Sequence, residues 1–90
     1  MSIENYLNHP TFGLLFRVCL VNENQELFAT LYAQRLFFLV TSGNQDGIVF
    51  EPIGRSDARM LLEGRMRLLR RAGQYSDYER LQLTYKQTFQ

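Results

Sequence analysis

Hydrophobic and polar positions change their period once along the chain, near Gly54. Before this residue, short runs rich in β-branched and aromatic side chains alternate with turn sequences, a pattern typical of β-strands. The successive runs and turns are 12–21, 22–25, 26–32, a less clear turn near Ala33 and Gln34, 35–41, 42–47 and 48–53. Four or five short strands at such spacings predict a small, strongly bent antiparallel sheet or barrel.

After Gly54, apolar residues recur at helical spacing. The stripe consists of Ala58, Leu61, Leu62, Met66, Leu68 and Leu69. Ser56 is the expected N-cap of this helix, and Gly73 is its expected C-terminal stop. The sequence SDYE at 76–79 has the form of a capping box and predicts a second helix that runs to about Phe89. Because the connection between them is short, the two helices are expected to form a hairpin.

The change of period divides the chain into two predicted parts, a β domain over residues 1–54 and a helical hairpin over residues 55–90. The expected fold class is therefore α+β, a small bent antiparallel barrel followed by two helices. The two parts also differ in charge. The net charge of +1 is the sum of −3 in residues 1–54 and +4 in residues 55–90.

The run TLYAQRLFFLV at 30–40 raises the question of what covers both faces of the predicted sheet, since neighbouring side chains of a strand point to opposite faces. One face is expected to carry Phe12, Leu14, Tyr32, Leu36 and Phe38, and the other Leu15, Val18, Leu20, Leu31, Phe37, Leu39 and Val49. Two helices cover one face of such a sheet and rarely both. Leaving five such side chains in water forgoes roughly 1.5–3 kcal/mol each. We therefore expect a partner to cover the aromatic face, the alternative being that the hairpin packs over it.

Composition and single residues exclude several classes of protein. A hydrophobic content of 46% with 21% charged residues is typical of a globular chain. The apolar run LFFLV is too short to span a bilayer, and the start MSIENYLNHP lacks the basic and apolar segments of a signal peptide. Cys19 is the single cysteine and lies in an apolar run, which suits a buried thiol in a reducing compartment. A cytoplasmic location is expected.

Groups for catalysis or metal binding are few. His9 is the only histidine, and its position relative to carboxylates such as Glu4 does not have the spacing of a metal site. None of the motifs of metal centres, nucleophile elbows or phosphate loops is present. The glycines of SGNQDG at 42–47 join two strands, whereas phosphate-binding loops open a helix. We therefore expect neither an enzyme nor a metal site.

Arginines gather on one arc of the predicted first helix. They are Arg59, Arg67, Arg70 and Arg71. One interpretation is a solvated face supported by pairs of Glu63 with Arg59 and with Arg67. The other is a contact surface for an acidic partner or for phosphates, which makes direct nucleic-acid binding the alternative function. Arg65 instead falls within the apolar arc, and we expect it to pass its stem over the core and to pair with an acid from the sheet.

Several segments of the sequence resemble the cyanobacterial PII-interacting protein X family. They are ENYLNHPTFGLL (4–15), NQELF (24–28), TLYAQRLFFLVT (30–41), FEPI (50–53), DARML (57–61) and LTYKQTFQ (83–90). The resemblance covers essentially the whole chain. It implies a Tudor-like barrel followed by two helices, an adaptor without catalytic role, and no cofactor, since the effector is sensed by the partners.

The resemblance also implies partners. The trimeric signalling protein PII holds members of the family when 2-oxoglutarate is low. The transcription activator NtcA, a dimer, binds them as coactivators when 2-oxoglutarate is high, and no direct DNA contact is expected. RNA polymerase is a candidate third partner of the helices, where the face of Arg59, Arg67, Arg70 and Arg71 would suit it.

Matching motifs carry one shared binding face onto this chain. It comprises Glu4, Tyr6, His9, Phe12, Tyr32, Gln34, Arg35, Leu36 and Phe38. Because both partners use largely the same face in the family, the two complexes are expected to exclude each other. Tyr32 is the expected centre of the contact, flanked by a polar rim of Gln34 and Arg35. No role is transferred to the turn at 42–47.

Overall fold

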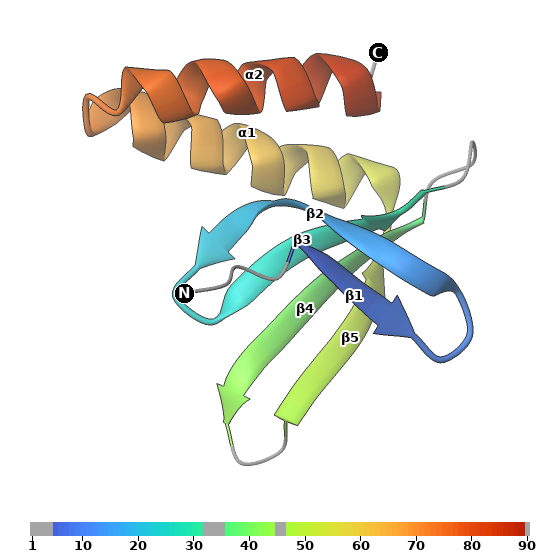
Figure 1. The fold of residues 1–90 in the computed structure, drawn as a ribbon. Helices are drawn as coiled ribbons and strands as arrows, with labels where there is room; N and C mark the ends of the chain where they lie inside the picture. Colours follow the sequence, from blue (N-terminus) through green and yellow to red (C-terminus); the bar gives the residue numbers. More distant parts are fainter. Residues whose placement is uncertain (1–4, 32–35, 45–46, 90) are drawn as a thin grey trace.

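Five antiparallel strands form a curled sheet, and two antiparallel helices lie on one side of it (Figure 1). The computed structural model describes residues 5–31, 36–44 and 47–89. The strands are β1 (Tyr6–His9), β2 (Gly13–Asn22), β3 (Gln25–Thr30), β4 (Phe37–Asn44) and β5 (Gly47–Ile53), paired in the order β1-β2-β3-β4-β5. The helices are α1 (Arg55–Arg71) and α2 (Tyr75–Phe89). The predicted α+β class, with a bent antiparallel sheet and a helical hairpin, is confirmed, the sheet being a half-barrel.

The strand boundaries differ from the predicted ones in β1 and β4. Residues 6–9, which precede the first predicted strand, form strand β1 and pair with β2, with Tyr6 opposite Phe16 and His9 opposite Gly13. β4 continues through Thr41 to Asn44, into the segment predicted as a turn. Its pairing with β5 is irregular between Thr41 and Asn44, and Gly43 has a φ of 95° there. Part of the segment that was predicted as a turn is therefore an irregular end of β4.

The predicted turn between the second and third runs is confirmed by the ends of β3 and β4. The Thr30 N–H donates to the Leu36 carbonyl at 3.0 Å, and the Leu36 N–H donates to Thr30 Oγ1 at 2.9 Å. These two bonds close the base of the connection. Ala33 and Gln34, where the turn was expected, lie outside the described residues.

The first helix ends as predicted but begins differently. Gly73 has a φ of 77°, its N–H donates to the Arg70 carbonyl, and the Gln74 N–H donates to the Leu69 carbonyl. This is a Schellman motif, which favours glycine because of the positive φ. At the start, the cap position is Gly54 in an extended conformation without a side-chain cap bond, so the prediction of Ser56 as N-cap is wrong.

The second helix also begins earlier than predicted. It starts at Tyr75, and the Tyr78 N–H donates to the Gln74 carbonyl at 3.0 Å. Gln74 therefore occupies the cap position, and the capping box predicted to begin at Ser76 is wrong. The physical reason is that Gln74 serves both helices. Its N–H closes the end of α1, and its carbonyl accepts the first bond of α2.

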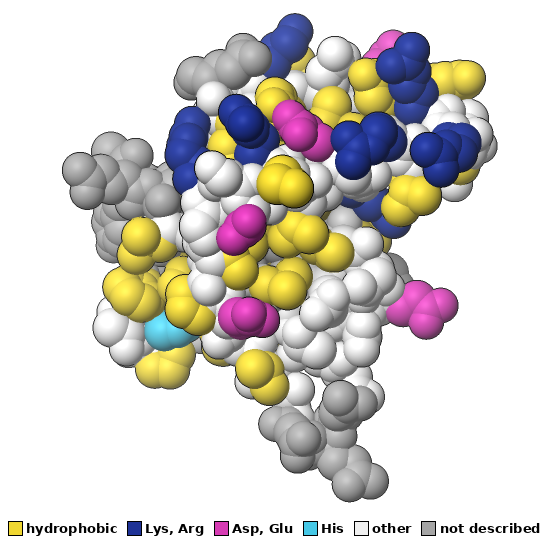
Figure 2. Space-filling model, turned by 180° about the vertical axis from the view of Figure 1, so that it is seen from behind, with side chains coloured by type: hydrophobic (Ala, Val, Ile, Leu, Met, Phe, Trp, Pro, Cys, Tyr) yellow, Lys and Arg dark blue, Asp and Glu magenta, His cyan; other side chains and the backbone are white. Residues whose placement is uncertain are grey.

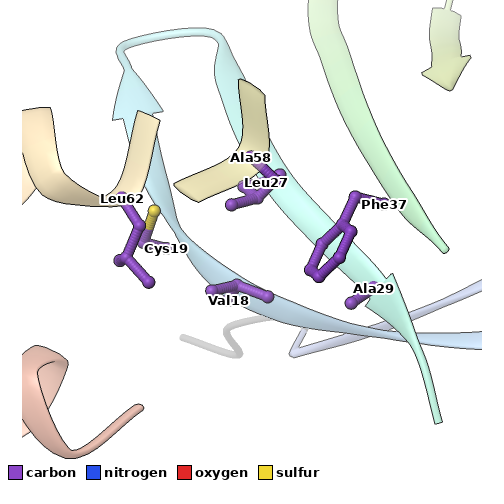
Figure 3. Packing of buried hydrophobic residues seen from close by; sticks show 7 residues of the cluster. All are labelled: Val18, Cys19, Leu27, Ala29, Phe37, Ala58 and Leu62. Atoms are coloured by element: carbon purple, nitrogen blue, oxygen red, sulfur yellow. The ribbon is translucent and has the colours of Figure 1, made fainter. Parts of the chain in front are cut away.

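One hydrophobic core lies between the sheet and the helices. Figure 3 shows side chains of β2, β3 and β4 facing those of α1. The cluster is Val18, Cys19, Leu27, Ala29, Phe37, Ala58 and Leu62, with Leu81, Tyr85 and Phe89 of α2 packed against it. The rings of Phe37 and Phe89 stack at 5.3 Å between centroids. Leu81, Tyr85 and Phe89 therefore define the face of α2 that meets the core.

A second core fills the concave side of the curled sheet. It consists of Leu15, Phe28, Phe38 and Val40, with Leu7 and Phe50 packed against it. The expectation that a partner must cover this whole face is wrong for Phe38, which is only 2% exposed. Curling of the sheet brings β1 and β5 over the face, as the contacts of Leu7 and Phe50 with it show.

Leu15 belongs to this second core, although it was predicted on the side of the helices. Strand alternation places Leu15 opposite to Phe16 and Val18, which pack toward the helices. A register shift between Arg17 and Cys19 then turns Cys19 to the same side as Val18. The bulge therefore sets which residues of β2 meet each core.

Candidate functional site

Four aromatic rings meet at one end of the half-barrel. His9 is the centre of the group, with ring centroids 5.1 Å from Phe12, 5.0 Å from Phe38 and 4.9 Å from Phe50. The rings come from β1, the β1–β2 turn, β4 and β5. Tilted and edge-to-face contacts at these distances are favourable beyond the burial of area. The cluster therefore links the two edge strands, β1 and β5, to each other and to β4.

Hydrogen bonds of His9 also fix the β1–β2 turn. Its Nδ1 accepts from the N–H of Thr11 at 3.0 Å and from the N–H of Phe12 at 3.2 Å. The acceptor role assigns the ring proton to Nε2. Gly13 follows with a φ of 75°, a conformation that side chains other than glycine rarely adopt. The turn holds Phe12 partly in solvent and partly against the cluster.

We expect His9 to stabilise the fold by about 1–3 kcal/mol through its ring contacts and its two accepted hydrogen bonds. His9→Ala removes both and should lower the midpoint of urea unfolding. His9→Asn restores an acceptor near the position of Nδ1, and His9→Phe restores a ring without the acceptor. Each should recover part of the loss. An alanine variant as stable as the parent protein would show that the turn does not depend on this side chain.

An apolar rim surrounds the same end of the sheet. It consists of Phe12, Leu14, Leu31 and Leu36, with exposed fractions of 40%, 40%, 48% and 47%. The pairing of Leu15 with Thr30 brings the β1–β2 turn and the β3–β4 connection to this end. Hydrophobic side chains gather around the single histidine in Figure 2. Clustered exposed apolar side chains are typical of a protein-interaction surface.

The predicted binding residues are distributed unevenly. The structure brings His9, Phe12 and Phe38 together and places Leu36 at the rim. Phe38 is buried, so it mainly supports the rings of His9 and Phe12 that pack against it. Tyr6 is 53% exposed but stands at the other end of β1. The remaining predictions, Glu4, Tyr32, Gln34 and Arg35, lie outside the described residues.

Phe50 belongs to the aromatic cluster and was missed by the sequence analysis. The signal was the alternation in IVFEPI, which places Phe50 between two residues of the opposite face. That alternation did not reveal the curl of the sheet, and without the curl β5 does not approach β1. The role of His9 as an acceptor in the turn was missed for the same kind of reason, since it depends on the conformation of the turn.

The arginine face of α1 lies where it was predicted. Arg59, Arg67, Arg70 and Arg71 are all exposed, and Figure 2 shows basic side chains over the helices. Arg59 approaches Glu63 at 4.0 Å, but the expected pair of Glu63 with Arg67 is not formed. Instead, the Tyr85 hydroxyl donates to Glu63 Oε2 at 2.6 Å and links the two helices. Both interpretations of the arginine face stay open.

The Cys19 thiol is held in its protonated form. Burial raises its pKa to about 12, and the nearby positive charges of Arg65 and Arg17 lower it only in part. A thiol of this kind is a poor nucleophile. Within the part of the chain that the structure describes, no group of three or more His, Cys, Asp or Glu side chains is placed to hold a metal ion. The helices described here are also too short or too polar to cross a membrane.

Comparison with known proteins gives a family for this architecture. The half-barrel with its apolar rim and helical hairpin has the features of a small protein-interaction module. A model of the family described as PII-interacting protein X matches residues 3–89, nearly the whole chain. The chain belongs to this family, which is a regulatory family named for its interaction with PII. No curated protein matches the chain significantly.

Proposed function

We propose that this protein is a non-enzymatic adaptor and transcriptional coactivator that exchanges between PII and the activator NtcA. PII holds it when 2-oxoglutarate is low, and NtcA binds it when 2-oxoglutarate is high. The exchange would link the balance of carbon and nitrogen to gene expression. The observation that carries the proposal is the apolar rim at one end of the half-barrel, in a chain of the PII-interacting family.

The rim supports the proposal because it is exposed yet built on a packed base. The ring of Phe12 packs against the ring of Phe38, with 5.5 Å between centroids. The Phe12 N–H also donates to Nδ1 of His9, which fixes the turn. A contact surface that is ordered before binding loses less conformational entropy in the complex. Tyr32, Gln34 and Arg35 belong to the segment that connects β3 to β4, and the family resemblance makes them the centre of the contact.

Sharing of one face explains how a single small chain could serve two partners in turn. If the PII trimer and the NtcA dimer both cover the apolar rim and the residues around Tyr32, the two complexes exclude each other. The effector then acts on the partners alone, so the chain itself needs no cofactor. The compartment of such an exchange is the cytoplasm. RNA polymerase at the arginine face of α1 would be a third, separate contact.

Direct nucleic-acid binding is the second candidate function. The observation that favours it is the exposed arginine face of Arg59, Arg67, Arg70 and Arg71. Such binding would weaken steeply with salt and would need no protein partner. A mobility-shift assay of DNA and RNA with the isolated chain distinguishes it from the adaptor function.

The adaptor function is tested by retention of PII and of NtcA on the immobilised chain. We expect retention of PII in the presence of ADP, and loss of this retention when 2-oxoglutarate and ATP are added. We expect 2-oxoglutarate to increase the retention of NtcA. Retention of neither protein under any of these conditions would refute the proposed function, whereas retention that ignores 2-oxoglutarate would refute the exchange.

A further inference from the structure

A second concave surface lies between β2 and the two helices. It is a groove of about 350 Å³ to which β2, α1 and α2 all contribute. Its lining includes the buried apolar side chains of Val18, Cys19 and Leu69, which form the floor. Three arginines line it as well, namely Arg17, Arg65 and Arg80. None of these residues belongs to the apolar rim, so the groove is a separate surface.

The three arginines differ in what they bind. The Arg17 guanidinium donates to Glu26 at 2.9 Å and to Asn5 Oδ1 at 3.2 Å. Arg80 pairs with Asp77 at 3.1 Å. Arg65, although partly buried, forms no hydrogen bond or ion pair with any other residue that the structure describes.

The expectation that Arg65 pairs with an acid of the sheet is therefore wrong. Glu26 of β3 is an acid that faces this part of β2, and Arg17 already binds it. Among the residues that the structure describes, none therefore occupies the hydrogen-bond donors of the Arg65 guanidinium, which lines the groove. Arg65 is nevertheless partly buried and lines the groove together with buried apolar residues, which agrees with its position in the apolar arc of α1.

The positive charges of Arg65 and Arg17 also act on the Cys19 thiol in the floor of the groove. Although burial dominates the pKa of the Cys19 thiol and raises it, both Arg65 and Arg17 act on that thiol in the opposite direction. They therefore stand close enough to favour a negative charge there. An anion that entered the groove would meet the same field without the cost of burying a thiolate.

The lining also indicates which anion fits. A guanidinium presents a planar pair of donors that matches a carboxylate or a phosphate. The Asp77 carboxylate lines the same groove and would repel a doubly charged phosphate more than a singly charged carboxylate. The apolar floor favours a ligand that carries its charge beside a hydrophobic group. A glutamate next to a leucine has this chemistry.

We propose that this groove binds an acidic and apolar segment of a partner protein, with Arg65 as the anchor of one carboxylate. The contact goes beyond the exchange at the apolar rim and does not depend on it. The helical hairpin and β2 would then hold a partner segment between them, so that the two parts of the chain act as one binding surface.

The test is a nuclear magnetic resonance titration of the full chain with N-acetyl-leucyl-glutamate amide. We expect saturable shifts at the backbone amides of Val18, Leu69 and Thr84, which line the groove. Arg65→Gln should weaken the binding by about tenfold, since it removes a charge-assisted hydrogen bond. Arg65→Lys keeps the charge but lacks the planar pair of donors. Its affinity for the probe should therefore lie between those of the parent chain and of Arg65→Gln. Arg71→Gln, an exposed arginine of the same helix outside the groove lining, should change nothing.

Two further probes decide the chemistry. N-acetyl-leucyl-glutamine amide has the same shape without the charge and should bind at least tenfold more weakly. Inorganic phosphate at equal ionic strength should also bind more weakly. The proposal is overturned if the glutamate probe fails to saturate up to about 50 mM, well above a millimolar Kd. Equal binding of the neutral probe, tighter binding of phosphate, or indifference to both Arg65 variants would overturn it equally.

Discussion

Replacing Phe28 with alanine is expected to destabilise the protein by about 3–5 kcal/mol, as truncation of a buried phenylalanine usually does. Phe28 is fully buried in the second core, inside the curl of the sheet. Its truncation removes transfer free energy and leaves a cavity between Leu15, Phe38 and Val40. Domains of this size have a total stability of about 5–15 kcal/mol. A large part of the variant should therefore be unfolded on mild warming.

Urea unfolding followed by circular dichroism measures this loss. The matched control is Leu83→Ala on α2, because Leu83 is 60% exposed and alanine favours a helix. It should change the free energy of unfolding by about 0.5 kcal/mol or less. A loss of less than about 1.5 kcal/mol for Phe28→Ala would mean that the concave side is not tightly packed. The apolar rim would then have no rigid base.

The second large effect is expected at the proposed contact. Tyr32→Ala should weaken binding to PII and to NtcA by about 2 kcal/mol each, roughly thirtyfold, which is the size of a hot-spot effect. The fold should be unaffected. The hydrogen bonds between Thr30 and Leu36 close the base of the β3–β4 connection through backbone atoms and the Thr30 hydroxyl, and a change at Tyr32 removes none of these groups.

Isothermal titration of each partner with the parent chain and the variant gives these values. Met60→Ala is the control, since Met60 is 63% exposed on α1 and does not belong to the predicted binding face. It should bind both partners as the parent chain does. If Tyr32→Ala bound both partners normally, the face would be assigned wrongly. If it lost only one of them, the two partners would not share the face.

Much of the fold could be predicted because it follows from local pattern. Opposite faces for Phe37 and Phe38 follow from strand alternation, and each residue lies in a different core. The helical stripe placed Ala58 and Leu62 against the sheet. Gly73 predicted the end of α1 because a positive φ favours glycine. These features need no knowledge of distant contacts.

The features that could not be predicted depend on register and on competition between residues. Curling of the sheet is linked to irregular pairing in β2 and β4, which alternation alone does not reveal. The cluster around His9 needs that curl to bring β5 to β1. Arg65 was recognised as unusual in the sequence, yet only the bond between Arg17 and Glu26 explains why Arg65 does not pair with this acid of the sheet.

The candidate site was predicted by resemblance more than by pattern. Exposure supports Phe12 and Leu36 as contact residues, whereas the burial of Phe38 makes it a supporting residue. Sequence pattern had assigned all three to one exposed face, because it treated the sheet as flat. The arginine face of α1 was correctly located, because helical spacing alone decides which residues share an arc of a helix.

We propose that PII and NtcA compete for one face of this chain. To test this, a complex of the chain with PII is purified in the presence of ADP. NtcA is then added together with 2-oxoglutarate and ATP. Size-exclusion chromatography with light scattering then gives the mass of each complex. We expect the chain to leave PII and to elute with NtcA, with no particle that contains all three proteins. A stable particle containing PII, NtcA and the chain would contradict it.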